Sequence, residues 1–193
     1  MSIISKDRPC IIHSDIIWTL KFVKKLYIKN NGIDISQLHL NFLSNYLGND
    51  NLIFPSFNYD FPKTKEFDIR NTPSDVGQLS NYILTCKDYT RTQTPVFSFL
   101  TKIKELIQKK IDYPFLKDSV FDYLYQNDGL IIFYGTNISH CTYLHYVESQ
   151  IDMPIYRYDK TFKGFIINET KIENVKVTFH VRPLNLDLKS NFE

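Results

Sequence analysis

The sequence predicts an α/β domain built on a mixed β-sheet. Short apolar runs alternate along the chain with segments in which apolar residues recur every three or four positions, the pattern of strands alternating with helices. Residues 175–181 instead alternate apolar and polar side chains, which indicates a strand with one open face and favours a mixed sheet over an all-parallel one. With 193 residues, 43% of them hydrophobic, we expect one domain spanning residues 1–193.

Two strands and two helices are predicted in the first 54 residues. Residues 9–12 and 52–54 are short apolar runs typical of buried strands. Residues 16–27 and 36–47 have helical periodicity, and each segment lies next to polar residues that can cap a helix. Gly48 marks the end of the second helix.

The rest of the chain continues the alternation. Residues 61–73 and 85–95 lack an apolar period and are predicted to be loops. Helical spacing is found at residues 76–83, 99–107 and 120–124, and strand-like runs at residues 130–134, 164–167 and 175–181.

The strand predicted at residues 130–134 is followed by the strongest candidate for chemistry. A turn begins at Gly135, and a helix then carries His145 and Glu148, which lie on one face because they are three residues apart. An imidazole beside a carboxylate suits proton transfer. Ligand sites of open α/β sheets lie beyond the carboxyl ends of strands, where this pair is expected.

Other interpretations of this pair remain open from spacing alone. His145 is also compatible with a half-buried structural histidine beside a solvated Glu148. A metal site would need two or three further ligands, and His140 lies on another part of the helical turn. Cys141, one turn before His145, could form a nucleophile pair with it or could be an inert thiol.

Polar residues also follow the two early strands. His13, Ser14 and Asp15 follow the first strand, where they could cap a helix or form an anion-binding cradle. Asn58, Tyr59 and Asp60 follow the second, and Asp60 could be a turn residue, bind a cationic amine or orient His145.

Composition excludes several function classes. The net charge of +2 argues against a dedicated nucleic-acid or acidic-membrane binder. No apolar stretch approaches the roughly 20 residues of a membrane span, and no glycine-rich nucleotide motif occurs. The three cysteines lack metal-ligand spacing, and their odd number without a signal peptide favours a reducing cytoplasm. The aromatic content of 15% leaves a homo-oligomer open.

Taken in order, these segments resemble the aminoglycoside 3-N-acetyltransferase family, with a closer similarity to its branch found with surface-polysaccharide and amino-sugar biosynthesis. The resemblance runs through most of the chain. It is carried by the following residues: His13-Ser14-Asp15, Pro55 to Asp60, Phe67-Asp68, Thr72-Pro73-Ser74, Gly77, Leu79, Arg91-Thr92, Pro95, Ser98, Ser119-Val120-Phe121, Gly129, Gly135, Thr142, His145 and Glu148.

The resemblance implies a three-layer α/β/α sandwich and an acetyl-CoA-dependent transfer to an amine. It implies a catalytic group of His145, Glu148 and Asp60, with His145 as general base and no covalent acyl-enzyme. We further expect Asn58, Tyr59 and Thr142 to bind the acceptor. The cofactor side is expected to comprise the following residues: His13, Ser14, Asp15, Arg91, Thr92 and Ser98.

Two departures from the family shape the expected function. Thr94 stands where antibiotic-modifying members have His, which favours an amino sugar, such as a nucleotide-linked one, over an aminoglycoside. The chain ends at Glu193, earlier than expected for the family, so a C-terminal segment could be missing. The alternatives are a shortened or partner-dependent member that binds a ligand without turnover, and an O-acyltransferase of the same fold.

Overall fold

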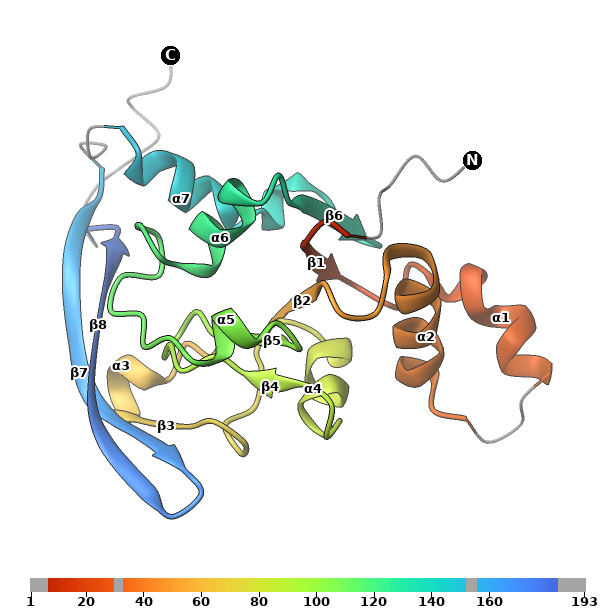
Figure 1. Ribbon diagram of the computed structural model, residues 1–193, viewed down its shortest axis with the longest axis horizontal. Coiled ribbons are helices and arrows are strands. Elements are labelled where there is room, and N and C mark those ends of the chain that lie inside the picture. The colour runs from red at the N-terminus through yellow and green to blue at the C-terminus, as the bar shows by residue number, and fades with distance from the viewer. Residues whose placement is uncertain (1–6, 30–32, 152–155, 184–193) are drawn as a thin grey trace.

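A five-stranded mixed sheet organises the protein (Figure 1). The computed structural model describes residues 7–29, 33–151 and 156–183. The strand order is β4-β5-β2-β1-β6. The strands are β1 (Cys10–Ser14), β2 (Leu52–Pro55), β4 (Thr90–Arg91), β5 (Phe99–Thr101) and β6 (Leu130–Tyr134). β1 pairs in parallel with β2 and β6, whereas β5 is antiparallel to β2 and β4. The predicted α/β class with a mixed sheet is confirmed.

Helices cover this sheet. Those in the first half are α1 (Leu20–Lys29), α2 (Ile35–Leu47), α3 (Phe61–Thr64) and α4 (Gln78–Leu84). Those in the second half are α5 (Lys104–Ile107), α6 (Val120–Gln126), the 3-10 turn η1 (Ile138–His140) and α7 (Tyr143–Ser149). Side chains cap the start of two helices: the Asp34 carboxylate accepts from the Ser36 N–H, and the Ser119 hydroxyl accepts from the Asp122 N–H.

Both faces of the sheet are buried, which explains its continuous apolar runs. Successive side chains of a strand point to opposite faces, so Cys10 and Ile12 of β1 join one core and Ile11 joins the other. The first core includes Leu43 of α2 and Leu79 of α4. The second core is closed by these residues of α6, α7 and a second sheet: Phe121, Leu124, Tyr146, Ile166, Val177 and Phe179.

The second sheet comprises β3 (Glu66–Asp68), β7 (Tyr158–Asn168) and β8 (Lys171–Val181). β7 and β8 form a long antiparallel hairpin along the left side of Figure 1, and β3 runs parallel to β7. The alternation predicted at residues 175–181 is confirmed, because Val177 and Phe179 are buried whereas Lys176 is exposed and ion-pairs with Asp112. This strand lies in the second sheet, and it is β5 that makes the main sheet mixed.

Four boundary predictions are corrected by the structure. The first helix begins at Leu20 rather than at residue 16, after a turn that exposes Ile17 and Trp18. The loop predicted at residues 61–73 contains α3 and β3, and the loop predicted at residues 85–95 contains the short strand β4. The helix predicted at residues 99–107 is β5 followed by α5, because backbone pairing of Phe99–Thr101 with β2 overrides the helical spacing.

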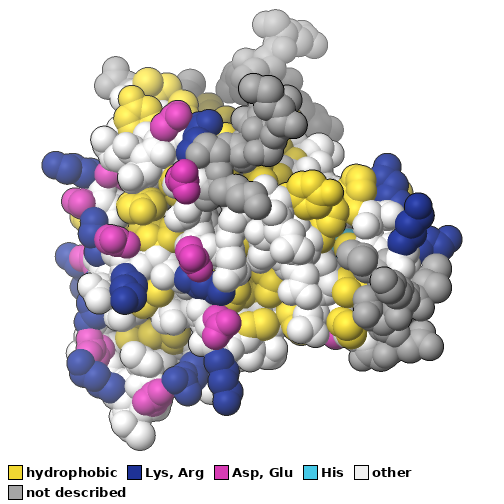
Figure 2. All heavy atoms as spheres, turned by 45° about the vertical axis from the view of Figure 1, so that its right-hand side comes forward, with side chains coloured by type: hydrophobic (Ala, Val, Ile, Leu, Met, Phe, Trp, Pro, Cys, Tyr) yellow, Lys and Arg dark blue, Asp and Glu magenta, His cyan; other side chains and the backbone are white. Residues whose placement is uncertain are grey.

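Charge is distributed over the surface as the composition suggests. On the face shown in Figure 2, basic and acidic side chains are interspersed over the left side of the view. None of the helices in the described part of the chain is both long and apolar enough to cross a membrane.

Candidate active site

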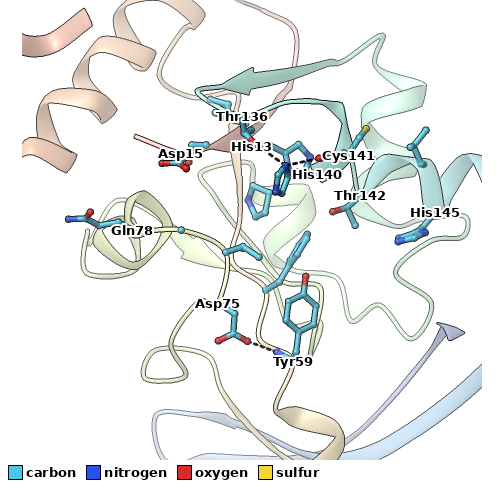
Figure 3. A pocket seen from close by; sticks show the side chains of 18 of the residues that line it. His13, Asp15, Tyr59, Asp75, Gln78, Thr136, His140, Cys141, Thr142 and His145 are labelled. Atoms are coloured by element: carbon cyan, nitrogen blue, oxygen red, sulfur yellow. Dashed lines mark hydrogen bonds between the residues drawn. The ribbon is translucent and has the colours of Figure 1, made fainter. Parts of the chain in front are cut away.

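The carboxyl ends of β1, β2 and β6 open into one cavity of about 830 Å³ (Figure 3). Its walls are residues 12–17, 75–78 and 139–142, together with these side chains: Pro55, Phe57, Tyr59, Thr136, Leu144, His145, Glu148, Arg157 and Arg182. Parallel pairing of the three strands brings together segments more than 100 positions apart in sequence.

His145 and Glu148 form the predicted pair on α7. The imidazole Nδ1 lies 3.0 Å from Glu148 Oε2. Because an ionised carboxylate only accepts hydrogen bonds, Nδ1 carries the proton and Nε2 is the basic nitrogen. The side chain of His145 is 31% exposed and lines the cavity, so a ligand can reach it.

Glu148 has two further partners from the segment that enters β7. The Tyr156 hydroxyl donates to Glu148 Oε1 over 3.1 Å. Arg157 Nε lies 3.1 Å from Glu148 Oε2, and the contact is an ion pair rather than an aligned hydrogen bond. Burial raises the pKa of Glu148, but the bond from His145, the Arg157 charge and the Tyr156 hydroxyl outweigh it, so the net pKa is lowered.

The pKa of His145 is lowered from its usual value. Burial is the main cause, and the positive charges of Arg157 and His180 act in the same direction. The hydrogen bond and charge of Glu148 oppose the shift but do not cancel it. The ring also contacts that of Phe115, with centroids 5.1 Å apart. His145 is therefore largely neutral at neutral pH, as a general base must be.

A second histidine pair lies on the β1 side of the cavity (Figure 3). His13 is buried and stacks on Phe133, and burial together with the charge of His140 lowers its pKa to about 4. Its Nε2 has no hydrogen-bond partner among the described residues. The exposed His140 is held by the hydroxyls of Thr136 and Ser139, 2.9 and 3.2 Å from Nδ1.

Two glycines allow the cavity walls to approach each other. Gly135, after β6, has φ +79°, and a Cβ there would collide with the Asp15 carbonyl oxygen. Gly77 has φ +103°, and a Cβ there would lie 3.2 Å from the Ser14 carbonyl oxygen. Both sites suit only glycine, and they fix Ser14 and Asp15 in the cavity wall.

Of the three residues predicted at the site after β2, only Tyr59 lines the cavity. Its N–H donates to the Asp75 carboxylate over 2.8 Å (Figure 3). Asn58 is buried outside the lining and donates to the Pro73 carbonyl. Asp60 is exposed at the start of α3, also outside the lining. The partners of Glu148 are Tyr156 and Arg157, and Asp60 is not brought to His145 as the sequence suggested.

Three residues expected on the cofactor side belong instead to a buried network. Arg91 donates to Ser98 Oγ over 2.8 Å and to the carbonyl oxygens of Thr72 and Ser56. Thr92 bonds to the Phe99 backbone. None of these three residues lines the cavity. Their network supports the cavity wall indirectly, because Ser56 lies between two lining residues and Thr72 lies shortly before the lining residue Asp75.

Sequence reasoning missed the two residues that hold Glu148. Tyr156 and Arg157 lie beyond α7, in a stretch with no periodic or motif signal. Only the return of the chain into the β7–β8 hairpin places them beside α7. Thr142, which was expected at the site, precedes α7 and lines the cavity. Within the described ranges, no group of three acidic, cysteine or histidine side chains could hold a metal ion.

The fold and cavity together define a mixed α/β protein with a neutral His–Glu pair at the carboxyl ends of parallel strands. The pattern of the aminoglycoside 3-N-acetyltransferase family matches residues 41–193, more than half of the chain, so the protein belongs to this family. A comparison with curated protein sequences finds no significant match.

Solved structures share the fold. AAC-IIIb, in a binary complex with CoASH, has a TM-score of 0.72 and 13% identity, with 93% of this chain and 72% of that chain covered. YokD from Bacillus subtilis has a TM-score of 0.70 and 16% identity, covering 91% and 76%. The AAC(3)-IVa apoenzyme has a TM-score of 0.63 and 18% identity, covering 92% of this chain. This chain spans 65% of the length of AAC(3)-IVa.

Proposed function

We propose that the protein is an acetyl-CoA-dependent N-acetyltransferase that acts on an amino group of a sugar. The observation that carries the proposal is the His145–Glu148 pair, reachable in a cavity large enough for a cosubstrate and an acceptor together. Membership in the aminoglycoside 3-N-acetyltransferase family and the likeness to CoASH-bound AAC-IIIb support acetyl-CoA as the donor.

The proposed reaction needs one base and no covalent intermediate. Nε2 of His145 takes a proton from the acceptor ammonium or amine, directly or through water, because an ammonium has no lone pair with which to attack. The nitrogen then attacks the thioester carbonyl, and the C–N bond forms. The C–S bond breaks, and the leaving sulfur takes a proton from the His145 imidazolium, so that CoA is released as the thiol and His145 is neutral again. An acceptor that bound as an ammonium loses its second proton to water as the amide forms. Glu148 fixes the tautomer that presents Nε2 to the cavity.

The cavity walls suggest where each reactant binds. His13, Ser14 and Asp15 are the candidates for the cosubstrate side, with the neutral His13 ring able to hydrogen-bond an uncharged group. Tyr59 and Thr142 are the candidates on the acceptor side. The position of Asp60 favours a supporting role at the start of α3 over a direct one in proton transfer.

Arg182, in the wall of the same cavity as His145, favours a nucleotide-linked amino sugar as the acceptor. Arg182 lines the cavity, is exposed, and has no carboxylate partner in the described part of the chain. A free guanidinium binds phosphate by paired hydrogen bonds and repels a polycation. Thr94, where antibiotic-modifying members have His, is buried next to Pro95 and points to the same distinction.

Thiol release from acetyl-CoA, measured with amino sugars, nucleotide-linked amino sugars and aminoglycosides, tests this function. We expect turnover with a nucleotide-linked amino sugar, and His145→Gln should lower it by about 10²- to 10⁴-fold. Mass spectrometry of the product separates N- from O-acetylation. CoA binding without turnover of any acceptor would contradict the enzymatic proposal, and full turnover by His145→Gln would contradict the mechanism.

A further inference from the structure

Glu148 is held at both carboxylate oxygens by residues that the family pattern did not point to. Tyr156 donates to Oε1, while Arg157 Nε and His145 Nδ1 both meet Oε2 at 3.1 and 3.0 Å. We call Tyr156 and Arg157 the carboxylate clamp. The arginine side chain is only 8% exposed, so solvent screens this ion pair less than a surface pair.

We propose that the carboxylate clamp positions Glu148 and balances its charge, so that Glu148 orients His145 while the imidazole remains free to accept a proton. The inference rests on the proposed role of His145 as the base. Tyr156 and Arg157 act through Glu148 and are positioning residues. Glu148 alone could rotate about its side-chain torsions, and the contact at Oε1 removes that freedom.

The physical need for Arg157 follows from the charge of Glu148. A carboxylate beside an imidazole stabilises the imidazolium, which cannot act as a base. The Arg157 cation offsets this attraction and repels a proton on His145 as well, so it favours the neutral ring in both ways. Glu148 can then orient the His145 ring by accepting its hydrogen bond, while a smaller fraction of His145 is protonated.

None of the other charged groups described around His145 is placed to offset the charge of Glu148 as Arg157 is. On the β8 side, His180 faces His145 and is itself 2.9 Å from the carboxylate of Asp159 on β7. On α7, the charged neighbour is Glu148. Arg182 lines the same cavity and is exposed. Arg157 is the cation of this group that is both buried and paired with Glu148.

The test is a pH titration of the His145 ring by NMR, assigned by the resonance lost in His145→Gln. In Arg157→Gln we expect the pKa of His145 to rise by about one unit, because the Glu148 charge is no longer offset. In Arg157→Lys, which keeps the charge, most of that shift should be absent. Lys163→Gln removes one exposed lysine of β7 and serves as the matched control.

Kinetics add a second measurement. The acid limb of kcat/KM should move to higher pH in Arg157→Gln by the same amount as the NMR pKa. Tyr156→Phe, which removes only the hydroxyl bond, should lower kcat severalfold with a much smaller shift of the limb. An Arg157→Gln protein that is folded and has an unshifted His145 pKa would overturn the inference.

The outcomes separate the inference from the proposed function. The NMR titration needs no turnover, so it tests the clamp even if no acceptor is acetylated. If Arg157→Gln does not fold, Arg157→Met keeps most of the apolar stem and takes its place. If neither variant folds, unchanged kcat in Tyr156→Phe would overturn the positioning role, and a severalfold loss with wild-type stability would support it.

Discussion

His145 lies between opposing electrostatic effects, and their balance sets the pH range of the proposed reaction. Burial and the neighbouring cations lower its pKa, while Glu148 raises it. The base is active when neutral, so kcat/KM should rise with pH and reach half its maximum below about 6.5, the ordinary histidine pKa.

Glu148→Gln should shift this pH profile in a defined direction. Loss of the carboxylate removes an effect that raises the pKa of His145, so the acid limb should move to still lower pH. Maximal turnover should also fall, because the ring loses its orienting acceptor. The pH dependence of kcat/KM measures both effects, and movement of the limb to higher pH would contradict this account.

His13 gives a separate, thermodynamic prediction. Its folded-state pKa is about 4, whereas an unfolded histidine titrates near 6.5. Between these values the unfolded chain binds the additional proton, so His13 favours folding fully above about pH 6.5 and less as the pH falls towards 4.

Replacing His13 should therefore flatten the pH dependence of stability. In His13→Phe, which keeps a ring against Phe133, the slope between these pH values should decrease by up to about 1.4 kcal/mol per unit. Denaturant unfolding at several pH values measures it. Lys163→Gln, at an exposed position of β7, is the control, and an unchanged slope in His13→Phe would refute the assignment.

At the scale of elements, the site depends on segments that the buried arginine network holds in place. Arg91 connects β4 to the Ser56 and Thr72 carbonyl oxygens, and its guanidinium lies 4.7 Å from the Phe67 ring centroid. Burial lowers the pKa of Arg91 to about 10, so it stays charged at neutral pH. The network therefore joins β2, β4 and the segment that leads to Asp75.

Arg91→Met should cost about 3 kcal/mol of unfolding free energy, because three oxygen acceptors, two of them in buried contacts, each lose a hydrogen bond from the guanidinium. The midpoint of denaturant unfolding measures this. Arg70→Met, which breaks an exposed ion pair with Glu169, should cost less than about 0.5 kcal/mol. Wild-type stability with a raised KM for acetyl-CoA would instead place Arg91 in the cosubstrate site, as the sequence suggested.

At the scale of the whole molecule, three strand ends, α7 and the hairpin close one cavity. If this chain binds CoA as proposed, ligand binding should stabilise the entire fold. A concentration of CoA 100-fold above Kd would add about 2.7 kcal/mol, or several degrees in Tm. Thermal unfolding with increasing CoA measures this, with adenosine as a control that lacks the pantetheine arm. An unchanged Tm at millimolar CoA would contradict the proposed cosubstrate site.

Local patterns in the sequence were enough to predict the features that depend on nearby residues. Apolar periodicity and polar strand ends predicted the α/β class, β1, β2, β6 and the helix that pairs His145 with Glu148, because such patterns report nearby backbone geometry. Ordered motifs identified the family, which the match over residues 41–193 confirms.

Contacts between residues that are distant in sequence became known only from the folded arrangement. Residues 99–101 became a strand through pairing with β2, and Arg91, Thr92 and Ser98 became a buried network outside the cavity. Tyr156 and Arg157 reached Glu148 through the path of the hairpin, while Asp60 did not reach His145. Such contacts follow from how sheets and helices pack, which no local pattern of residues records.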